Sequence, residues 1–274
     1  MTRINFPNDF ISSKETKAIL SDLNNCNGCS VKCGKNGTGL VPADFYGGRP
    51  NGVMILAENP GWQNTSTRNF ILSLAESDWQ KITLLRLLFY NWINGLNEKL
   101  KGDTFKQKTI FEIIEETLEE VLDDNLANRH SIYITDVCKA CNYTLFDKMR
   151  DKSKSKVFKS CRDNFFKEEL KKINPKVVLS LGGSAYSSYT ALDGIEDTIY
   201  PSKESPTGRM SSNKNGDEGD HGKVYLSKNK RYLIPLIHPS GAARGSSGKD
   251  DDYGRTVKKA LTHVADDFRL REKT

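Results

Sequence analysis

The stretch that decides the fold is Gly52-Val-Met-Ile-Leu-Ala-Glu-Asn-Pro-Gly61. Its first half is an unbroken apolar run, typical of a strand that is buried on both faces, and its second half is a polar loop. The same arrangement recurs near the other end of the chain, where the apolar run 232–237 leads into His238-Pro-Ser-Gly-Ala-Ala-Arg244. Polar loops at the carboxyl ends of parallel strands are where α/β folds form ligand sites. The two loops therefore predict one shared site.

Further apolar runs between these loops alternate with segments of helical periodicity. Strands are predicted at 53–56, 131–135, 176–181 and 232–237, and helices at 70–75, 81–100, 109–126, 154–173, 184–192 and 255–271. Asn174-Pro175 is expected to end the fourth helix, because proline disfavours helical backbone in the residue before it. Alternating strands and helices indicate a mostly parallel sheet covered on both faces. We predict a three-layer α/β/α architecture.

Changes in composition divide the chain into a lead-in and a single domain. Residues 1–25 form the lead-in, and residues 26–270 form one α/β domain. Within that domain, residues 200–222 are rich in Ser, Lys, Asn, Gly and Asp. Such a composition is typical of a long exposed loop, so we predict an insertion there.

The charge balance favours a polyanionic partner without proving one. The chain of 274 residues has a net charge of +6, which suits nucleic acid but also suits simple solubility. No apolar stretch of signal-peptide or membrane-spanning type is present, so a cytoplasmic protein without a membrane partner is expected. Thiols stay reduced in that compartment, and the six cysteines therefore suggest metal ligands before disulfides.

Several motifs, taken in order, resemble the uracil-DNA glycosylase superfamily, and the iron–sulfur branch (family 4) fits best. The motifs, in chain order, are Cys26-x-x-Cys29, Ala57-Glu-Asn-Pro-Gly61, Arg68-Asn-Phe70, Tyr133-Ile-Thr-Asp136-Val-Cys-Lys-Ala-Cys141, Cys161, Pro175-Lys-Val-Val-Leu-Ser-Leu-Gly-Gly183 and His238-Pro-Ser-Gly-Ala-Ala-Arg244. The resemblance covers about nine-tenths of the chain. It implies the fold of that superfamily and the removal of a base from DNA.

The resemblance implies a hydrolytic site with three candidate catalytic residues. His238 would donate a hydrogen bond to the pyrimidine O2, where charge accumulates as the base leaves. Asn59 is the first candidate to position the attacking water and Glu58 the second, since a carboxylate can also act as a base. No lysine stands at a matched position. Water rather than an amine is therefore expected to attack, which leaves an abasic site and an uncut strand.

Three residues are candidates to hold the flipped base. The ring of Phe70 would stack on it, although a core role for this residue is equally compatible with the sequence. Ala57 stands where the family branch usually has glycine, and Asp136 where it usually has asparagine. An ionised aspartate only accepts hydrogen bonds, so it opposes uracil O4 and suits the amino group of a cytosine. The alternative is that Asp136 caps a loop and the substrate is still uracil.

These features lead to three functional hypotheses. The first is a monofunctional DNA glycosylase acting on a modified cytosine, hydroxymethylated or glucosylated as in viral DNA, which is a role in antiviral defence. The second is a uracil-DNA glycosylase of base-excision repair. The third is a DNA-binding module without turnover. In each case DNA is the partner and a monomer is expected.

Contacts to DNA outside the base pocket are expected from two loops. The resemblance places Arg244 and Ser240 in the loop that enters the duplex beside the flipped nucleotide. Ser184 follows Gly182-Gly183 at a predicted helix start, where backbone N–H groups bind phosphate readily. Each of these three residues is therefore a candidate DNA contact.

The cysteines match the ligand pattern of the iron–sulfur branch with one displacement. The resemblance assigns a [4Fe-4S] cluster of structural role to Cys26, Cys29, Cys141 and Cys161. Ala140 occupies the position where the third ligand would align, so Cys138 or Cys33 is open as a replacement. On spacing alone four thiolates suit zinc equally well, which keeps zinc as the alternative metal.

Overall fold

A mixed sheet of six strands forms the centre of the computed structural model, which describes residues 52–58, 117, 120–121, 132–138, 151–200, 220–237 and 250–271. The strand order is β2-β1-β3-β6-β5-β4. The strands are β1 (Val53–Ala57), β2 (Ile132–Asp136), β3 (Val177–Leu181), β4 (Asp197–Tyr200), β5 (Val224–Leu226) and β6 (Tyr232–Leu236). The four strands from β2 to β6 run parallel, and β5 and β4 are antiparallel additions at one edge. The predicted mostly parallel sheet is confirmed.

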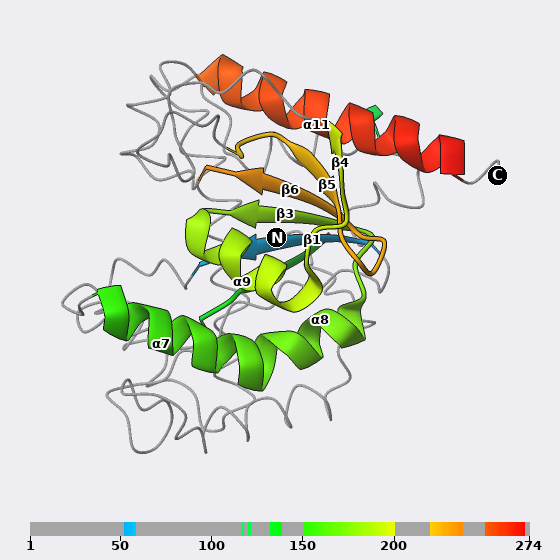
Figure 1. Cartoon of the computed structure of the whole chain (residues 1–274). Helices are drawn as coiled ribbons and strands as arrows, with labels where there is room; N and C mark the ends of the chain where they lie inside the picture. The colour runs from blue at the N-terminus through cyan, green and yellow to red at the C-terminus, as the bar shows by residue number, and fades with distance from the viewer. Residues whose placement is uncertain are drawn as a thin grey trace, which may run out of the picture.

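Helices cover both faces of this sheet, as expected for three layers. Figure 1 shows α11 on one face and α7, α8 and α9 on the other. Their bounds are α7 (Asp151–Cys161), α8 (Lys167–Ile173), α9 (Gly183–Asp193) and α11 (Asp250–Arg271), and a π-helical segment, η2 (Arg162–Phe166), joins α7 to α8. The helix ends at Asn174, whose left-handed backbone (φ 44°) precedes Pro175 as predicted.

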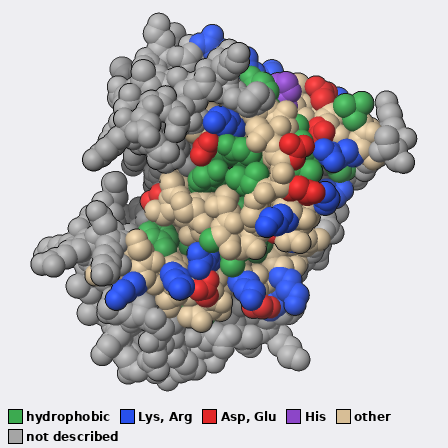
Figure 2. Space-filling view, viewed as in Figure 1, with side chains coloured by type: hydrophobic (Ala, Val, Ile, Leu, Met, Phe, Trp, Pro, Cys, Tyr) green, Lys and Arg blue, Asp and Glu red, His purple; other side chains and the backbone are tan. Residues whose placement is uncertain are grey.

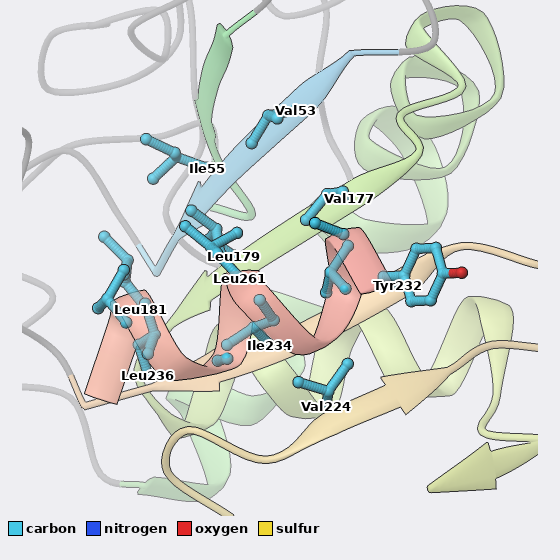
Figure 3. Packing of buried hydrophobic residues seen from close by; sticks show 14 of the residues in the cluster. Val53, Ile55, Val177, Leu179, Leu181, Val224, Tyr232, Ile234, Leu236 and Leu261 are labelled. Atoms are coloured by element: carbon cyan, nitrogen blue, oxygen red, sulfur yellow. The ribbon is translucent and has the colours of Figure 1, made fainter. Parts of the chain in front are cut away.

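Alternating side chains of each strand enter two separate hydrophobic cores. Val53 and Ile55 point toward α11, where they join a cluster that includes Leu261 (Figure 3). Met54 and Leu56 point the other way, into a cluster that contains residues of α8 and α9. Because successive strand residues face opposite sides, only a strand covered on both faces needs an unbroken apolar sequence. The run 53–56 therefore encodes the layer architecture.

Pro235 occupies an inner strand, where a proline would normally break the pairing. Strand β5 pairs with β6 only through Tyr232 and Leu233 and has separated before Pro235 is reached. The Pro235 carbonyl instead accepts the N–H of Gly222, at 2.8 Å. The N–H that proline lacks would point to this same side, so no strand partner is left without a donor.

Two short strands and the ends of the proposed insertion differ from the sequence prediction. Strands β4 and β5 were not predicted, because each is too short to show a periodic pattern. Tyr200 ends β4 and its ring stacks on His263 of α11, and His221 and Gly222 are buried. The ends of the predicted 200–222 insertion are thus packed against the domain. Residues 201–219 lie outside the described residues, as does the lead-in 1–25.

Most of the helices predicted before residue 130 lie outside the described residues. The segments 70–75 and 81–100 do so completely. In the segment 109–126, the described residues Thr117, Glu120 and Val121 are helical. Val121 packs against the core on the α11 side, and Glu120 forms an ion pair with Lys258 of α11. These contacts agree with a helix on that face.

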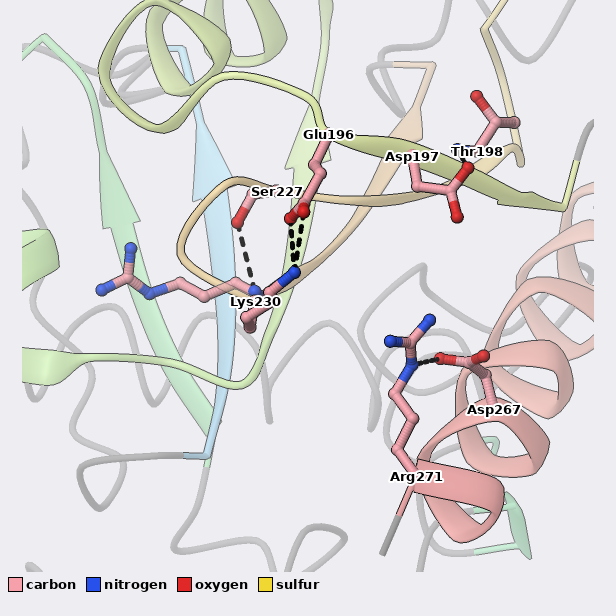
Figure 4. A network of polar contacts seen from close by, with 8 residues as sticks. Glu196, Asp197, Thr198, Ser227, Lys230, Asp267 and Arg271 are labelled. Atoms are coloured by element: carbon pink, nitrogen blue, oxygen red, sulfur yellow. Dashed lines mark hydrogen bonds and ion pairs between the residues drawn. The ribbon is translucent and has the colours of Figure 1, made fainter. Parts of the chain in front are cut away.

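A polar network fastens the amino-terminal edge of the sheet. The buried carboxylate of Asp193 accepts hydrogen bonds from Tyr189 (2.6 Å) and from Arg231 (2.9 Å). Burial would raise the pKa of Asp193, but the hydrogen bonds from Tyr189, Asn229 and Ser227 and the Arg231 charge lower it overall. Close by, Glu196 binds Lys230 (Figure 4). This network lies at the opposite end of the strands from the candidate site, so its role is structural.

The described surface carries basic side chains along one helical layer. Figure 2 shows Lys and Arg side chains gathered over α7 and α8. Lys156, Lys159, Lys167, Lys171 and Lys172 are exposed there. Among the helices of the described residues, none combines the length and apolar character needed to cross a bilayer.

Candidate functional site

The carboxyl ends of the parallel strands bring the predicted site segments together. Ala57 at the end of β1 is in register with Asp136 at the end of β2. The pairing continues beyond the strands, since the N–H groups of Val137 and Cys138 donate to the carbonyls of Ala57 and Glu58, each at 3.0 Å. On the other side of β1 lies β3, which leads directly into Gly182 and α9. Residues far apart in the sequence thus meet at one edge.

The side chain of Glu58 is held by the first turn of α9. Its Oε1 accepts the backbone N–H of Ser184 at 3.0 Å. This N–H is one of the donors that a helix leaves without an internal partner, and the helix dipole favours a negative charge there. Glu58 is half-buried. The carboxylate is therefore fixed at the edge of the sheet before any substrate binds.

Gly182 makes this contact possible. Its backbone has φ +92°, and a Cβ built on it would lie 2.5 Å from Glu58 Oε1. Its N–H donates to the carbonyl of Leu236 at 2.8 Å, which ties the turn to β6. Only glycine combines this backbone conformation with such a close approach. Gly182, the first glycine of the Gly-Gly pair after β3, is therefore a requirement of the Glu58 position.

The contact between Glu58 and Ser184 bears on the predicted phosphate contact of Ser184. The N–H expected to face phosphate is engaged by a carboxylate of this chain. A phosphate beside that carboxylate would meet like charge. The DNA contact of Ser184 remains a prediction, and the structure assigns its amide a role in positioning Glu58.

Asp136 is buried at the end of β2, with 5% of its surface exposed. Its neighbours on the same strand, Tyr133 and Thr135, both donate to the buried carboxylate of Glu169 (2.5 and 2.8 Å). That network belongs to the strand interior, and Asp136 lies beyond it at the carboxyl edge beside Ala57. An ionised carboxylate offers only hydrogen-bond acceptors, and the role of Asp136 toward a base stays a prediction.

His221 is a buried histidine that sequence reasoning missed, and it contacts the residue that precedes the predicted His238 loop. It lies in the turn before β5, is 1% exposed, and its Nδ1 accepts the N–H of Ile237 at 3.1 Å. Burial lowers its pKa to about 4, so the ring is neutral at pH 7 and carries its proton on Nε2. His221 thereby fixes the residue that precedes His238. The sequence offers only one signal for His221, which is that the chain has no more than four histidines.

Two cysteines, one of them two residues after Asp136 in the sequence, lie close together. Cys138 and Cys161 are both buried, and their Sγ atoms are 4.0 Å apart. Cys161 was predicted as a metal ligand, and Cys138 was one of the two open replacements. Within the described residues, no group of three or more His, Cys, Asp or Glu side chains could hold a metal.

The remaining predicted site residues lie outside the part of the chain that the structure describes, and their roles stay predictions. They are Asn59, Phe70, His238, Ser240, Arg244, Cys26, Cys29 and Cys141.

The fold defines a class of protein: three-layer α/β/α domains, in which ligand sites typically lie at the carboxyl ends of the parallel strands. A family model, the uracil DNA glycosylase superfamily, matches residues 46–262. The match spans most of the chain, which therefore belongs to this superfamily of DNA glycosylases. A comparison with curated proteins found no match. The expected family is confirmed, and its iron–sulfur branch remains a prediction.

Proposed function

We propose that this protein is a monofunctional DNA N-glycosylase, which flips a nucleotide out of DNA and hydrolyses its N-glycosidic bond. The observation that carries the proposal is the Glu58 carboxylate, bound to the Ser184 N–H at the strand edge in a chain of the uracil-DNA glycosylase superfamily. A fixed carboxylate at the ligand edge is the kind of group that this reaction needs. The product is an abasic site in an uncut strand.

The reaction creates a positive charge on the sugar and a negative charge on the base, and the proposed site residues are suited to stabilise both charges. As the C1′–N bond breaks, the sugar becomes cationic and the base leaves as an anion. The negative charge of Glu58 favours the cationic sugar, and its second oxygen and Asn59 are assigned to the attacking water. His238 is assigned to the anionic base. Because Ser184 holds Glu58 in advance, little reorganisation is needed in the transition state.

Asp136 supports a cytosine-type base as the substrate. The carboxylate is buried at the strand edge, where an ionised aspartate can only accept hydrogen bonds. It suits the exocyclic amino group of cytosine, whereas uracil O4 would face it with repulsion. A mispaired buried polar group costs about 1–3 kcal/mol. Removal of normal cytosine would damage the host genome, so we assign a hydroxymethylated or glucosylated cytosine of viral DNA and a role in antiviral defence.

Uracil repair is the alternative, and base release from defined duplexes separates the two. Purified protein would be incubated with duplexes containing uracil, cytosine, hydroxymethylcytosine or glucosylated hydroxymethylcytosine, and abasic sites would be cleaved with alkali. We expect cuts only at a cytosine derivative. Cuts only at uracil would make the protein a repair enzyme and Asp136 a neutral substitution.

Two variants assign the roles of the carboxylates. Asp136→Asn is expected to shift the preference toward uracil, and an unchanged preference would refute the role of Asp136. Glu58→Gln keeps the shape and the acceptor for Ser184 but removes the charge, and it should slow release of every base about 100-fold or more. If no base is released even by the unmodified protein, the third hypothesis, a DNA-binding module without turnover, replaces the enzyme.

A further inference from the structure

The end of β6 is fastened on its β5 side by the turn that precedes β5. The carbonyl of Pro235 accepts the N–H of Gly222 at 2.8 Å, and the N–H of Ile237 donates to Nδ1 of His221 at 3.1 Å. The first bond joins backbone to backbone, as in a strand ladder. In the second, an imidazole ring replaces the backbone acceptor. A side chain therefore extends the pairing of β6 to the residue directly before His238.

The shape of this turn explains why a side chain replaces the backbone acceptor. The turn begins at Asp220, whose carbonyl accepts the N–H of Lys223 at 3.2 Å. Gly222, the third residue of the turn, has φ +74°, and a type II turn requires a positive φ at this position. The Asp220 carbonyl is thus engaged within the turn. His221 supplies the acceptor for Ile237 instead.

Further contacts hold the turn in place. Oδ1 of Asp220 accepts hydrogen bonds from the Tyr225 hydroxyl at 2.7 Å and from Lys223 Nζ at 3.3 Å. The ring of Tyr225 lies beside that of Tyr186, near the start of α9, with the ring centroids 6.3 Å apart. His221 is 1% exposed, and burial lowers its pKa to about 4, so the ring is neutral at pH 7. The acceptor is therefore fixed in position and in protonation state.

The same strand end is connected to Glu58 on its other side. The N–H of Gly182 donates to the carbonyl of Leu236 at 2.8 Å, and Glu58 lies against Gly182 in the space that a Cβ would fill. The Glu58 carboxylate and the chain leading to His238 are thus held by the same turn after β3. Their relative position depends on how the end of β6 is fixed, and on the β5 side His221 makes the contact nearest to His238 in the sequence.

We propose that His221 is a positioning residue of the glycosylase reaction: through Ile237 it sets the direction in which the chain continues into His238. This inference rests on the proposed function, which assigns His238 to the anionic base. A donor to the leaving base has to be in place before the bond breaks. A misplacement of about 1 Å costs up to about 100-fold in rate. His221 has this effect without touching DNA.

Two amide side chains at position 221 separate the role of the acceptor from that of the ring. In His221→Asn the amide oxygen is bonded to Cγ, as Nδ1 is, so this variant keeps an acceptor for Ile237. In His221→Gln the amide lies one carbon further out, and His221→Leu has no acceptor. Single-turnover base release should slow about 10- to 100-fold in the Gln and Leu variants, and His221→Asn should recover most of the rate. The DNA concentration that gives the half-maximal rate should be the same in all variants.

Hydrogen exchange of the Ile237 amide, followed by NMR on isotope-labelled protein, reports the contact without turnover. A hydrogen-bonded amide exchanges slowly, so we expect faster exchange in His221→Gln and His221→Leu than in His221→Asn and the unmodified protein. If His221→Leu fails to fold, His221→Gln supplies the comparison. Leu261→Ala, in the core on the α11 side, is the control for lowered stability. Well below its melting temperature, it should release the base at the unmodified rate.

Three outcomes would overturn this inference and leave the proposed function standing. The first is equal exchange of the Ile237 amide in all the proteins. The second is faster exchange with an unchanged rate of base release in His221→Gln. The third is release as slow in His221→Asn as in His221→Gln, because the acceptor would then not be the group that matters. If the unmodified protein released no base from any duplex, the proposed function would fail, and this inference with it.

Discussion

Because Gly182 has no side chain, the carboxylate of Glu58 can lie directly against its backbone. A Cβ on Gly182 would lie 2.5 Å from Glu58 Oε1, and the next glycine, Gly183, has no atom within 4 Å of such a Cβ. The two adjacent glycines therefore have different structural roles. The first is required by a close approach and a positive φ, and the second is a helix position open to other residues.

Gly182→Ala should destabilise the protein and displace Glu58. A residue with a Cβ at this φ costs about 1–3 kcal/mol, and the new methyl group collides with the carboxylate. We expect a lower melting temperature and slower base release. Gly183→Ala is the matched control and should change neither by much, because alanine is favourable in a helix. Equal effects of the two substitutions would contradict the assigned contact.

His221 predicts a pH dependence of stability. Its folded pKa of about 4 lies below the ordinary value of 6.5. As the pH falls below 6.5, the unfolded chain binds a proton that the folded chain refuses, and stability is lost progressively down to the folded pKa. Between pH 7 and pH 5 this amounts to about 2 kcal/mol.

His221→Leu should remove this part of the pH dependence. Denaturant unfolding at pH 7 and pH 5 gives the loss for each protein, and carboxylates contribute equally to both. We expect a smaller loss between the two pH values in the variant. Identical losses would show that His221 is protonated as easily in the folded chain as in the unfolded one.

Among the elements, α11 illustrates how an amphipathic helix stabilises one face of the sheet. Leu261 is fully buried against strand residues such as Ile234, whereas Leu270, on the same helix, is 66% exposed (Figure 3). The helix is amphipathic, and its apolar side covers the face formed by alternate residues of β1, β3 and β6.

The same substitution at these two positions should have different effects. Leu261→Ala leaves a cavity in the core and is expected to cost about 2–5 kcal/mol of unfolding free energy. Leu270→Ala removes an exposed side chain, and a change within about 0.5 kcal/mol is expected. Chemical denaturation measures both. A small effect at Leu261 would mean that α11 is not required for the core.

At the scale of the whole molecule, charge is distributed in a way that suits DNA. The net charge is +6, and the exposed lysines of α7 belong to the helical layer beside α9, whose first turn holds Glu58. Lys228, in contrast, lies in the turn between β5 and β6, at the amino-terminal edge.

DNA affinity should therefore fall with salt, and it should depend on the lysines of α7. Each phosphate contact contributes about 0.9 to the slope of log affinity against log salt. Replacing both Lys156 and Lys159 by glutamine is expected to reduce this slope, and Lys228→Gln should leave it unchanged. Fluorescence anisotropy with a duplex at several salt concentrations gives the slopes. Equal slopes for all three proteins would assign the α7 lysines to solvation alone.

The sequence by itself determined the layers of this protein, and it predicts the edge at which the site lies. Strands buried on both faces need unbroken apolar runs such as 53–56, and polar loops follow where those runs end, so local pattern is enough. The tertiary structure alone decided which groups meet: Glu58 with Ser184, His221 with Ile237, and Cys138 with Cys161. The two residues of each pair are far apart in the chain, and no local sequence pattern predicts that they come into contact. The short strands β4 and β5 likewise depend on neighbours in space, because three or four residues gain stability only from pairing.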